Sequence, residues 1–366
     1  MRFPEFSGEW ETKSINDLAD VIGGGTPDTT VKSYWDGGIQ WFTPSEIGKN
    51  KFVDASLRTI TEDGLNNSSA KLLPPNTILL SSRATIGECS LSLRECATNQ
   101  GFQSLVSKKC NVDFLYYLIQ TKKKDLIRKS CGSTFLEISA NEVRKIQVSV
   151  PSDVEQQKIA GLLSLIDKRI ATQNKIIEKY ESLINGINCK IFASIQGSEY
   201  RLGDIATITN GNSNVQDAST EYRIGFYPFF DRSEEIKYLP TFLFDKESII
   251  YPGEGTEFTP RYFNGKFAVH QRCYAIFDFK EVVNPKFVYF FLKTQNSYFI
   301  RNAVGSTVPS LRLDTFQKLK VVIPLPEIQH SVSSFLSVLE QKLDVENNVI
   351  KKFLWQKQYL LRQMFI

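Results

Sequence analysis

An apolar stripe with alternating four- and three-residue spacings occurs twice in the chain, within residues 152–196 and 327–366. Gln173 interrupts the first stripe, and Glu346 interrupts the second at the equivalent position (346 − 173 = 173). The stripes comprise Ile159, Leu163, Ile166, Ile170, Gln173, Ile177, Tyr180, Ile184 and Ile187, and then Val332, Leu336, Leu339, Leu343, Glu346, Ile350, Phe353 and Leu360. This spacing, about 3.5 residues on average, is typical of a coiled-coil seam, so we predict two long helices.

Each predicted helix needs a partner, because a helix with one apolar face buries little surface by itself. We expect the two helices to pack against each other; the alternative is that each packs on its own globular domain. Since a whole domain separates them in the chain, the pair should be antiparallel, with the two domains at opposite ends. Ser152 and Glu155 fit a capping box at the start of the first helix.

The segments that precede the two helices combine strand and helix patterns. Short β-rich runs at residues 77–81 and 248–251 are predicted strands. Helices are expected to begin after Asn111 and Asn284, because an asparagine side chain accepts hydrogen bonds from the free amides of a first helical turn. Each segment is therefore predicted to form an α/β domain.

The two halves of the chain repeat the same order of patterns. Residues 111–134 resemble residues 284–307 at an offset of 173 (284 − 111), and this offset holds without a gap to Phe365. The starts of the halves also match, with Asp17 facing Asp204. We predict an α+β protein with a pseudo-twofold internal repeat. Its expected segments are domains at residues 1–151 and 197–326, and helices at residues 152–196 and 327–366.

Composition narrows the class of protein without naming a ligand. The net charge of +4 is small for 366 residues, so charge alone does not indicate nucleic-acid binding. With no run of about 18 apolar residues and no secretory signal at its start, the chain is expected to be cytoplasmic. The six cysteines lack a C-x-x-C pair and there are only two histidines, so we expect buried reduced thiols, no metal site and no cofactor.

The order of short motifs resembles one known family. Asp17 to Pro27 reads DLADVIGGGTP; a variable region, Gly132-Ser133-Thr134, a strand ending in proline and EQQKIA at Glu155 to Ala160 follow, and then the whole order repeats. This arrangement resembles the specificity subunits of Type I restriction-modification systems over essentially the full chain. The second half departs from the pattern, with GNSN in place of GGTP and PLPEIQH in place of PSDVEQQ.

The resemblance implies a non-catalytic reader of double-stranded DNA. Each variable domain would be a target-recognition domain that reads one half of a bipartite site. The two helices would set the half-site spacing and dock two methyltransferase (modification) subunits, and motor-nuclease (restriction) subunits would join through the complex.

Specific reading requires side chains that donate and accept at base edges, together with others that hold phosphates. In the first domain the expected DNA-binding residues are Thr26, Trp41, Thr43, Ser45, Lys71, Arg83, Thr85, Asn99 and Gln100. In the second they are Asp231, Arg232, Ser233, Arg261, Tyr262, Asn264, Lys266, His270, Gln271 and Arg272. Residues 39–45 align with 227–233, and residues 98–100 align with 269–271. The alternative for each residue is a solvated or turn-stabilising role.

Two other features carry weaker signals. Lys122, Lys123 and Lys124 form a basic cluster with Arg128 and Lys129, for which we favour a solvated helix end over a phosphate contact. The sequence from Asn284 to Phe287, NPKF, only faintly echoes the N-P-P-[YF] of adenine methyltransferases, and a helix cap explains it better. A solitary DNA adenine methyltransferase and a coiled-coil scaffold without DNA reading are the alternative functions.

Overall fold

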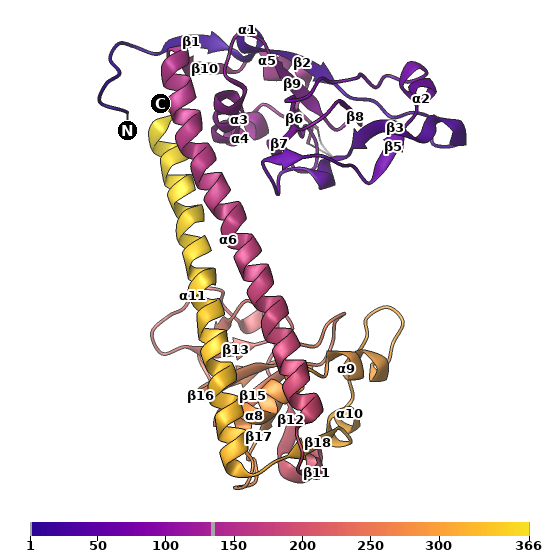
Figure 1. Cartoon of the computed structure of the whole chain (residues 1–366), viewed down its shortest axis with the longest axis vertical. Helices are drawn as coiled ribbons and strands as arrows, with labels where there is room; N and C mark the ends of the chain where they lie inside the picture. The colour runs from indigo at the N-terminus through magenta and orange to yellow at the C-terminus, as the bar shows by residue number, and fades with distance from the viewer. Residues whose placement is uncertain (1, 133–135, 366) are drawn as a thin grey trace. The chain divides into compact units, whose positions relative to one another are not determined.

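The computed structural model describes residues 2–132 and 136–365 and divides the chain into two compact units. Unit 1 contains residues 1–174 together with 349–366, and unit 2 contains residues 175–348. Each unit therefore consists of one α/β domain and parts of both long helices (Figure 1). Ser133 and Thr134 of the repeated motif lie outside the described residues. Within the described ranges, we find no helix that is long and apolar enough to cross a membrane.

The domain of unit 1, called domain 1 below, is built on two small sheets. One sheet has the order β2 (Ala19–Gly23), β9 (Gln103–Ser107), β6 (Ile78–Leu80), β7 (Cys89–Ser92) and β4 (Phe52–Val53). The other has the order β5 (Arg58–Ile60), β3 (Trp35–Phe42) and β8 (Cys96–Thr98). The helices are α1 (Ile15–Leu18), α2 (Glu62–Asn66), α3 (Val112–Thr121), α4 (Lys123–Arg128) and α5 (Ala140–Arg144).

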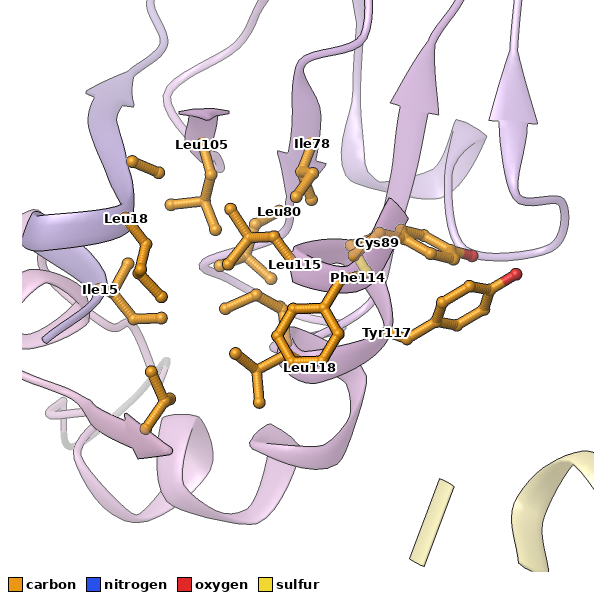
Figure 2. Close-up of a cluster of buried hydrophobic side chains, with 14 of the residues drawn as sticks. Ile15, Leu18, Ile78, Leu80, Cys89, Leu105, Phe114, Leu115, Tyr117 and Leu118 are labelled. Atoms are coloured by element: carbon orange, nitrogen blue, oxygen red, sulfur yellow. The ribbon is translucent and has the colours of Figure 1, made fainter. Parts of the chain in front are cut away.

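The core of domain 1 lies between the larger sheet and α3. The Asn111 side chain caps α3 by accepting from the Phe114 amide, which confirms the predicted helix start. From α3, Phe114 and Leu118 pack toward Leu18 and Leu105, and all four side chains are at most 2% exposed (Figure 2). This packing attaches the helix firmly to the sheet, since burying each such side chain stabilises the fold by about 1.5–3 kcal/mol.

The domain of unit 2, called domain 2, has a main sheet of six strands. Its order is β12 (Thr207–Asn210), β17 (Cys273–Phe277), β15 (Phe244–Pro252), β16 (Arg261–Val269), β13 (Tyr227–Phe230) and β14 (Lys237–Leu239). The helices are α7 (Leu202–Ile205), α8 (Pro285–Lys293), α9 (Asn296–Asn302) and α10 (Leu313–Gln317). As predicted, Asn284 caps α8, and Pro285 occupies its first turn.

Both domains are closed in the same way. In domain 1, β1 (Glu11–Ser14) pairs antiparallel with β10 (Gln147–Val150), so that Glu11 faces Val150. In domain 2, β11 (Ser198–Arg201) pairs antiparallel with β18 (Lys320–Ile323), so that Ser198 faces Ile323. The first strand of each domain therefore pairs with the strand that leads into a long helix, which confirms the internal repeat.

The two long helices are α6 (Asp153–Ser194) and α11 (Pro326–Met364), of 42 and 39 residues. Every residue of the two predicted stripes is buried or half-buried. In unit 1, the start of α6 shares an apolar cluster with the end of α11, and Leu163 and Leu360 both belong to it. The helices thus pack antiparallel, as predicted, although the same cluster also includes the core of domain 1. Helix pairing and packing on a domain are therefore combined rather than alternative.

A buried glutamine joins each long helix to its domain. Gln156 Oε1 accepts from the Asn111 amide at 3.0 Å, and Gln156 Nε2 donates to the Pro151 carbonyl at 3.0 Å. Gln329 repeats this arrangement, accepting from the Asn284 amide at 2.8 Å and donating to the Pro324 carbonyl at 2.9 Å. Each glutamine side chain therefore connects the cap of a domain helix to the turn that starts a long helix.

Two expectations about individual side chains are wrong. Glu155 does not complete a capping box with Ser152: its carboxylate lies buried against the guanidinium of Arg2, at 2.8 and 2.7 Å. Cys131 and Cys189 are exposed free thiols, whereas Cys89, Cys96 and Cys273 are buried as expected and Cys110 is half-buried. The Glu155 prediction failed because an ion pair with a residue distant in the chain has no local sequence signal.

Candidate nucleic-acid interface

Two neighbouring strand ends organise the predicted DNA-binding residues of domain 1. Strands β3 and β8 run parallel, with Phe42 facing Thr98, and the Asn99 amide donates to the Phe42 carbonyl at 3.1 Å. Thr43 and Asn99 therefore leave the sheet side by side. The two segments lie far apart in sequence, so only their pairing in the sheet brings them together.

Close backbone contacts bring further loops to the same place. A Cβ atom on Gly24 would lie 2.0 Å from the Asn99 carbonyl oxygen, so this approach requires glycine. The Gly25 amide donates to the Thr98 carbonyl at 2.8 Å, and the Ser82 amide donates to the Gly101 carbonyl at 2.8 Å. We call the resulting surface the first edge. It comprises Thr26, Thr43, Ser45, Arg83, Thr85, Asn99 and Gln100.

Local hydrogen bonds hold several side chains of the first edge. The Thr43 hydroxyl donates to Glu46 at 2.6 Å, and the Asn99 side chain accepts from the Gly101 amide at 2.8 Å. Arg83 forms an ion pair with Glu137 at 2.8 Å, while its Nε is buried without a partner among the described residues. The Arg83 side chain as a whole is 42% exposed, so its guanidinium remains accessible to a ligand.

The remaining predicted residues of domain 1 differ in exposure. Ser45, Lys71, Thr85 and Gln100 are exposed, and Lys71 follows the segment that packs against Gly25. Trp41 is only 5% exposed and its indole nitrogen donates to the Gly25 carbonyl at 2.9 Å. The structure therefore places Trp41 inside the domain, where it supports the edge by packing, and not on the surface where DNA would lie.

Domain 2 repeats this construction at the aligned residues. Strands β13 and β16 run parallel, with Phe230 facing Val269, and the His270 amide donates to the Phe230 carbonyl at 2.9 Å. A Cβ atom on Gly211 would lie 1.9 Å from the Val269 carbonyl oxygen. This register confirms the alignment of residues 39–45 with 227–233. The second edge comprises Asp231, Arg232, Ser233, Arg261, His270, Gln271 and Arg272.

The second edge is more strongly charged than the first. Asp231 is 5% exposed and contacts Lys237 at 2.6 Å and the Ser233 amide at 2.8 Å. Burial raises the pKa of the Asp231 carboxyl, but the hydrogen bonds from Lys237 and Ser233 outweigh burial and hold that pKa below its ordinary value. Arg261 donates to the carbonyls of Asp231 (at 3.0 Å) and Ser233, and its Nη1 is buried without a partner in the described part of the chain.

His270 is oriented as a neutral donor at this edge. Burial lowers the pKa of its imidazole, which is therefore mainly neutral at pH 7. Its Nδ1 accepts from the Arg272 amide at 3.3 Å, so the proton lies on Nε2. The Arg272 guanidinium contacts Glu254 at 2.7 Å and remains 62% exposed.

Three predicted residues of domain 2 have contacts that lead away from the second edge. The Tyr262 hydroxyl bonds Glu247, and its ring packs on Tyr289 of α8 at 5.8 Å between centroids. Lys266 lies over the ring of Phe242, and Asn264 pairs with Glu247 across the β15–β16 ladder. These residues were predicted because they follow Arg261 on the same strand. Successive side chains of a strand point to opposite faces of the sheet, so they cannot all lie on one surface.

Sequence reasoning also missed the residues that hold the edges in place. Glu46 was detectable, because Thr43 and Glu46 have the spacing of a capping box. Glu137, Lys237 and Glu254 had no local signal, since each reaches its partner only through the fold. Among the described residues, no group of histidine, cysteine and acidic side chains is arranged to hold a metal ion.

Comparison with known proteins assigns the family. The model of the Type I restriction modification DNA specificity domain matches residues 7–182 and again residues 197–353. The chain belongs to the specificity subunits of Type I restriction-modification systems. It is a non-catalytic DNA specificity subunit with two target-recognition domains, and the edges described above belong one to each of these domains.

Relatives and solved structures agree with this assignment. The MjaIX specificity subunit of Methanocaldococcus jannaschii is 30% identical, over 92% of this chain and 88% of its own length. The EcoR124I/EcoR124II specificity subunit of Escherichia coli is 30% identical over 44% of this chain and 41% of its own length. The crystal structure of the S subunit from M. genitalium has the same fold, with a TM-score of 0.61, 18% identity and coverage of 100% of this chain and 99% of that chain.

Proposed function

We propose that each target-recognition domain of this specificity subunit reads one half of a bipartite DNA site at its edge. The observation that carries the proposal is the shared register of β3·β8 and β13·β16, which presents two loops in the same geometry in both domains. On this common frame the side chains differ. Two readers of the same construction and different chemistry suit a target with two different halves.

The chemistry of each edge supports base reading. The first edge presents Asn99 and Gln100, whose amides can both donate and accept at a base edge. The second presents Arg232 and Gln271, both exposed, beside the donor Nε2 of His270. Because the donor and acceptor sets differ, the two domains should prefer different base sequences.

We infer that the long helices determine the distance between the half-sites. A continuous helix of 42 residues is about 60 Å long, and a DNA duplex presents the same face about every 34 Å. A stiff connection between two readers then favours one spacing of the half-sites. Removing one heptad from each helix should shorten the preferred gap or abolish assembly, and an unchanged gap would contradict this role.

The same helices have exposed apolar residues at equivalent positions, which supports docking of two methyltransferase subunits. Leu165 on α6 is 60% exposed, and Val338 on α11, offset by 173, is 50% exposed. Apolar residues exposed on a repeated scaffold suit two copies of one partner. Motor-nuclease subunits would join through the resulting complex.

We also propose that this protein acts in the cytoplasm. All six cysteines are free thiols, two of them exposed, which suits a reducing compartment. Bacterial and archaeal DNA shares that compartment.

Methylation-aware sequencing tests the central proposal. Cells that express the chain with its methyltransferase subunits should carry modified bases at one bipartite sequence. Replacing residues 1–151 with those of another specificity subunit should change one half of that sequence and leave the other half intact. A change in both halves would contradict independent reading, and the absence of any bipartite signal would favour a scaffold without DNA reading.

A further inference from the structure

Unit 1 contains a large cavity that none of the predicted DNA-binding residues lines. Its volume is about 1520 Å³, and its walls are the loop at residues 48–52, the segment from α3 to α4, and the facing sides of α6 and α11. All of these segments belong to unit 1. This volume exceeds the range of about 300–1,000 Å³ that is usual for a small-molecule pocket, which favours a segment of a macromolecule as the ligand.

Ion pairs hold the walls of the cavity together. Lys51, whose side chain is 9% exposed, contacts Asp113 of α3 at 2.6 Å and the Ser164 hydroxyl of α6 at 2.7 Å. Asp167 of α6 accepts from the Tyr117 hydroxyl at 2.5 Å and pairs with Lys357 of α11 at 2.8 Å. This network joins domain 1 to both long helices, so the cavity is formed before any ligand arrives.

The cavity has a large excess of positive charge. Its three acidic lining residues are each engaged: Asp113 by Lys51, Asp167 by Lys357, and Glu88 by Lys123. The lining residues Lys49, Lys122, Lys124, Lys168 and Arg362 form no ion pair with any residue that the structure describes. Five uncompensated cations around one cavity predict a polyanionic ligand.

We propose that this cavity binds the sugar-phosphate backbone of DNA beside the half-site read by domain 1. The inference rests on the proposed function and extends it to a second surface. Two segments connect this surface to the first edge: residues 43–52 carry Thr43 and Ser45 as well as Lys49, and residues 81–88 carry Arg83 as well as Glu88. The first edge and the cavity are therefore only a few residues apart along each of these two segments.

The types of side chain favour phosphate over bases. Lysine ammonium groups on flexible stems bind phosphate as point charges and carry little base specificity. The charge is also confined to one half, because Gln295, Asn296 and Ser297 occupy the positions of the three lysines in the repeat. The contact therefore adds affinity on one side of the target without adding sequence information.

The test transfers these residues of the second half into the first, as the variant K122Q/K123N/K124S in the full complex with methyltransferase subunits. Binding to the cognate duplex and to an unrelated duplex is measured as a function of salt. Removing one lysine–phosphate interaction reduces the slope of log affinity against log salt by about 0.9. We expect the slope to fall by about 2 and the affinity for both duplexes to fall at least about tenfold at low salt, with their ratio unchanged.

A matched control removes three lysine charges from domain 1 outside the cavity, as K108Q/K109Q/K145Q. The slope of the control should stay within about 0.5 of the wild-type slope. If both variants lost the same amount of slope and affinity, net charge alone would explain the effect and the proposal would be overturned. An unchanged slope with weakened assembly would assign the cavity to an acidic partner segment and also overturn it. The preference of the wild-type complex for its own site tests the proposed function separately.

Discussion

The buried glutamine that joins α6 to domain 1 offers the sharpest test of the fold. Gln156 is 2% exposed and satisfies the Asn111 amide and the Pro151 carbonyl, each at 3.0 Å. Leucine has a similar size but no polar atoms, so Gln156→Leu leaves the part-buried Asn111 amide and the buried Pro151 carbonyl unpaired. Each such group costs about 1–3 kcal/mol, which predicts a loss of about 2–6 kcal/mol in the free energy of unfolding of unit 1.

Tryptophan fluorescence measures this loss selectively, because all four tryptophans (residues 10, 35, 41 and 355) belong to unit 1. With a urea m-value of about 2–3 kcal/mol/M, the unfolding midpoint should fall by about 0.7–3 M. Gln157→Leu is the matched control, since Gln157 is exposed and its replacement should change stability by less than about 0.5 kcal/mol. If the two variants unfold at the same urea concentration, the reasoning about the buried glutamine is refuted.

Three further predictions address the edges and the helices. Gly24→Ala should lower the stability of unit 1 by about 1–3 kcal/mol, because the new Cβ would meet a carbonyl oxygen at 2.0 Å. It should also weaken reading of one half-site, which methylation of variant targets would measure. Gly38→Ala is the control and should have neither effect, because its Cβ would meet nothing within 4 Å. Asp231→Asn should destabilise unit 2 at pH 7, because a carboxyl group with a lowered pKa stabilises the fold when the pH is above that pKa. Unfolding followed by circular dichroism should show that the difference between variant and wild type disappears as the pH falls through the lowered pKa of Asp231. Trp355 on α11 is 70% exposed and should contribute to docking of the methyltransferase subunits. Trp355→Ala should therefore weaken assembly with these subunits by at least about tenfold and leave the urea midpoint unchanged. An unchanged affinity would exclude Trp355 from the interface.

Periodicity and repetition were sufficient to predict the architecture. The 3.5-residue stripe predicted two long paired helices because burial of one helix face depends only on spacing along the chain. The offset of 173 linked Asn111 with Asn284, and both cap helices as expected. Alignment of the halves also related Thr43 to Asp231, although no local pattern indicated that each residue ends a parallel strand.

The sites depended on contacts between residues that are distant in sequence. Gln156 and Gln157 are identical in type and adjacent, yet one is buried in a hydrogen-bonded turn and the other is exposed, a difference that only the packing of α6 on domain 1 creates. Trp41 was predicted to lie on the DNA-binding surface, but the pairing of β3 with its neighbours turns it inward. From sequence alone, Lys122, Lys123 and Lys124 resemble an ordinary solvated helix end. In the structure they line a cavity whose other walls include α6 and α11. Local spacing specifies which face of an element is apolar, whereas the neighbours of each polar side chain are determined by long-range packing.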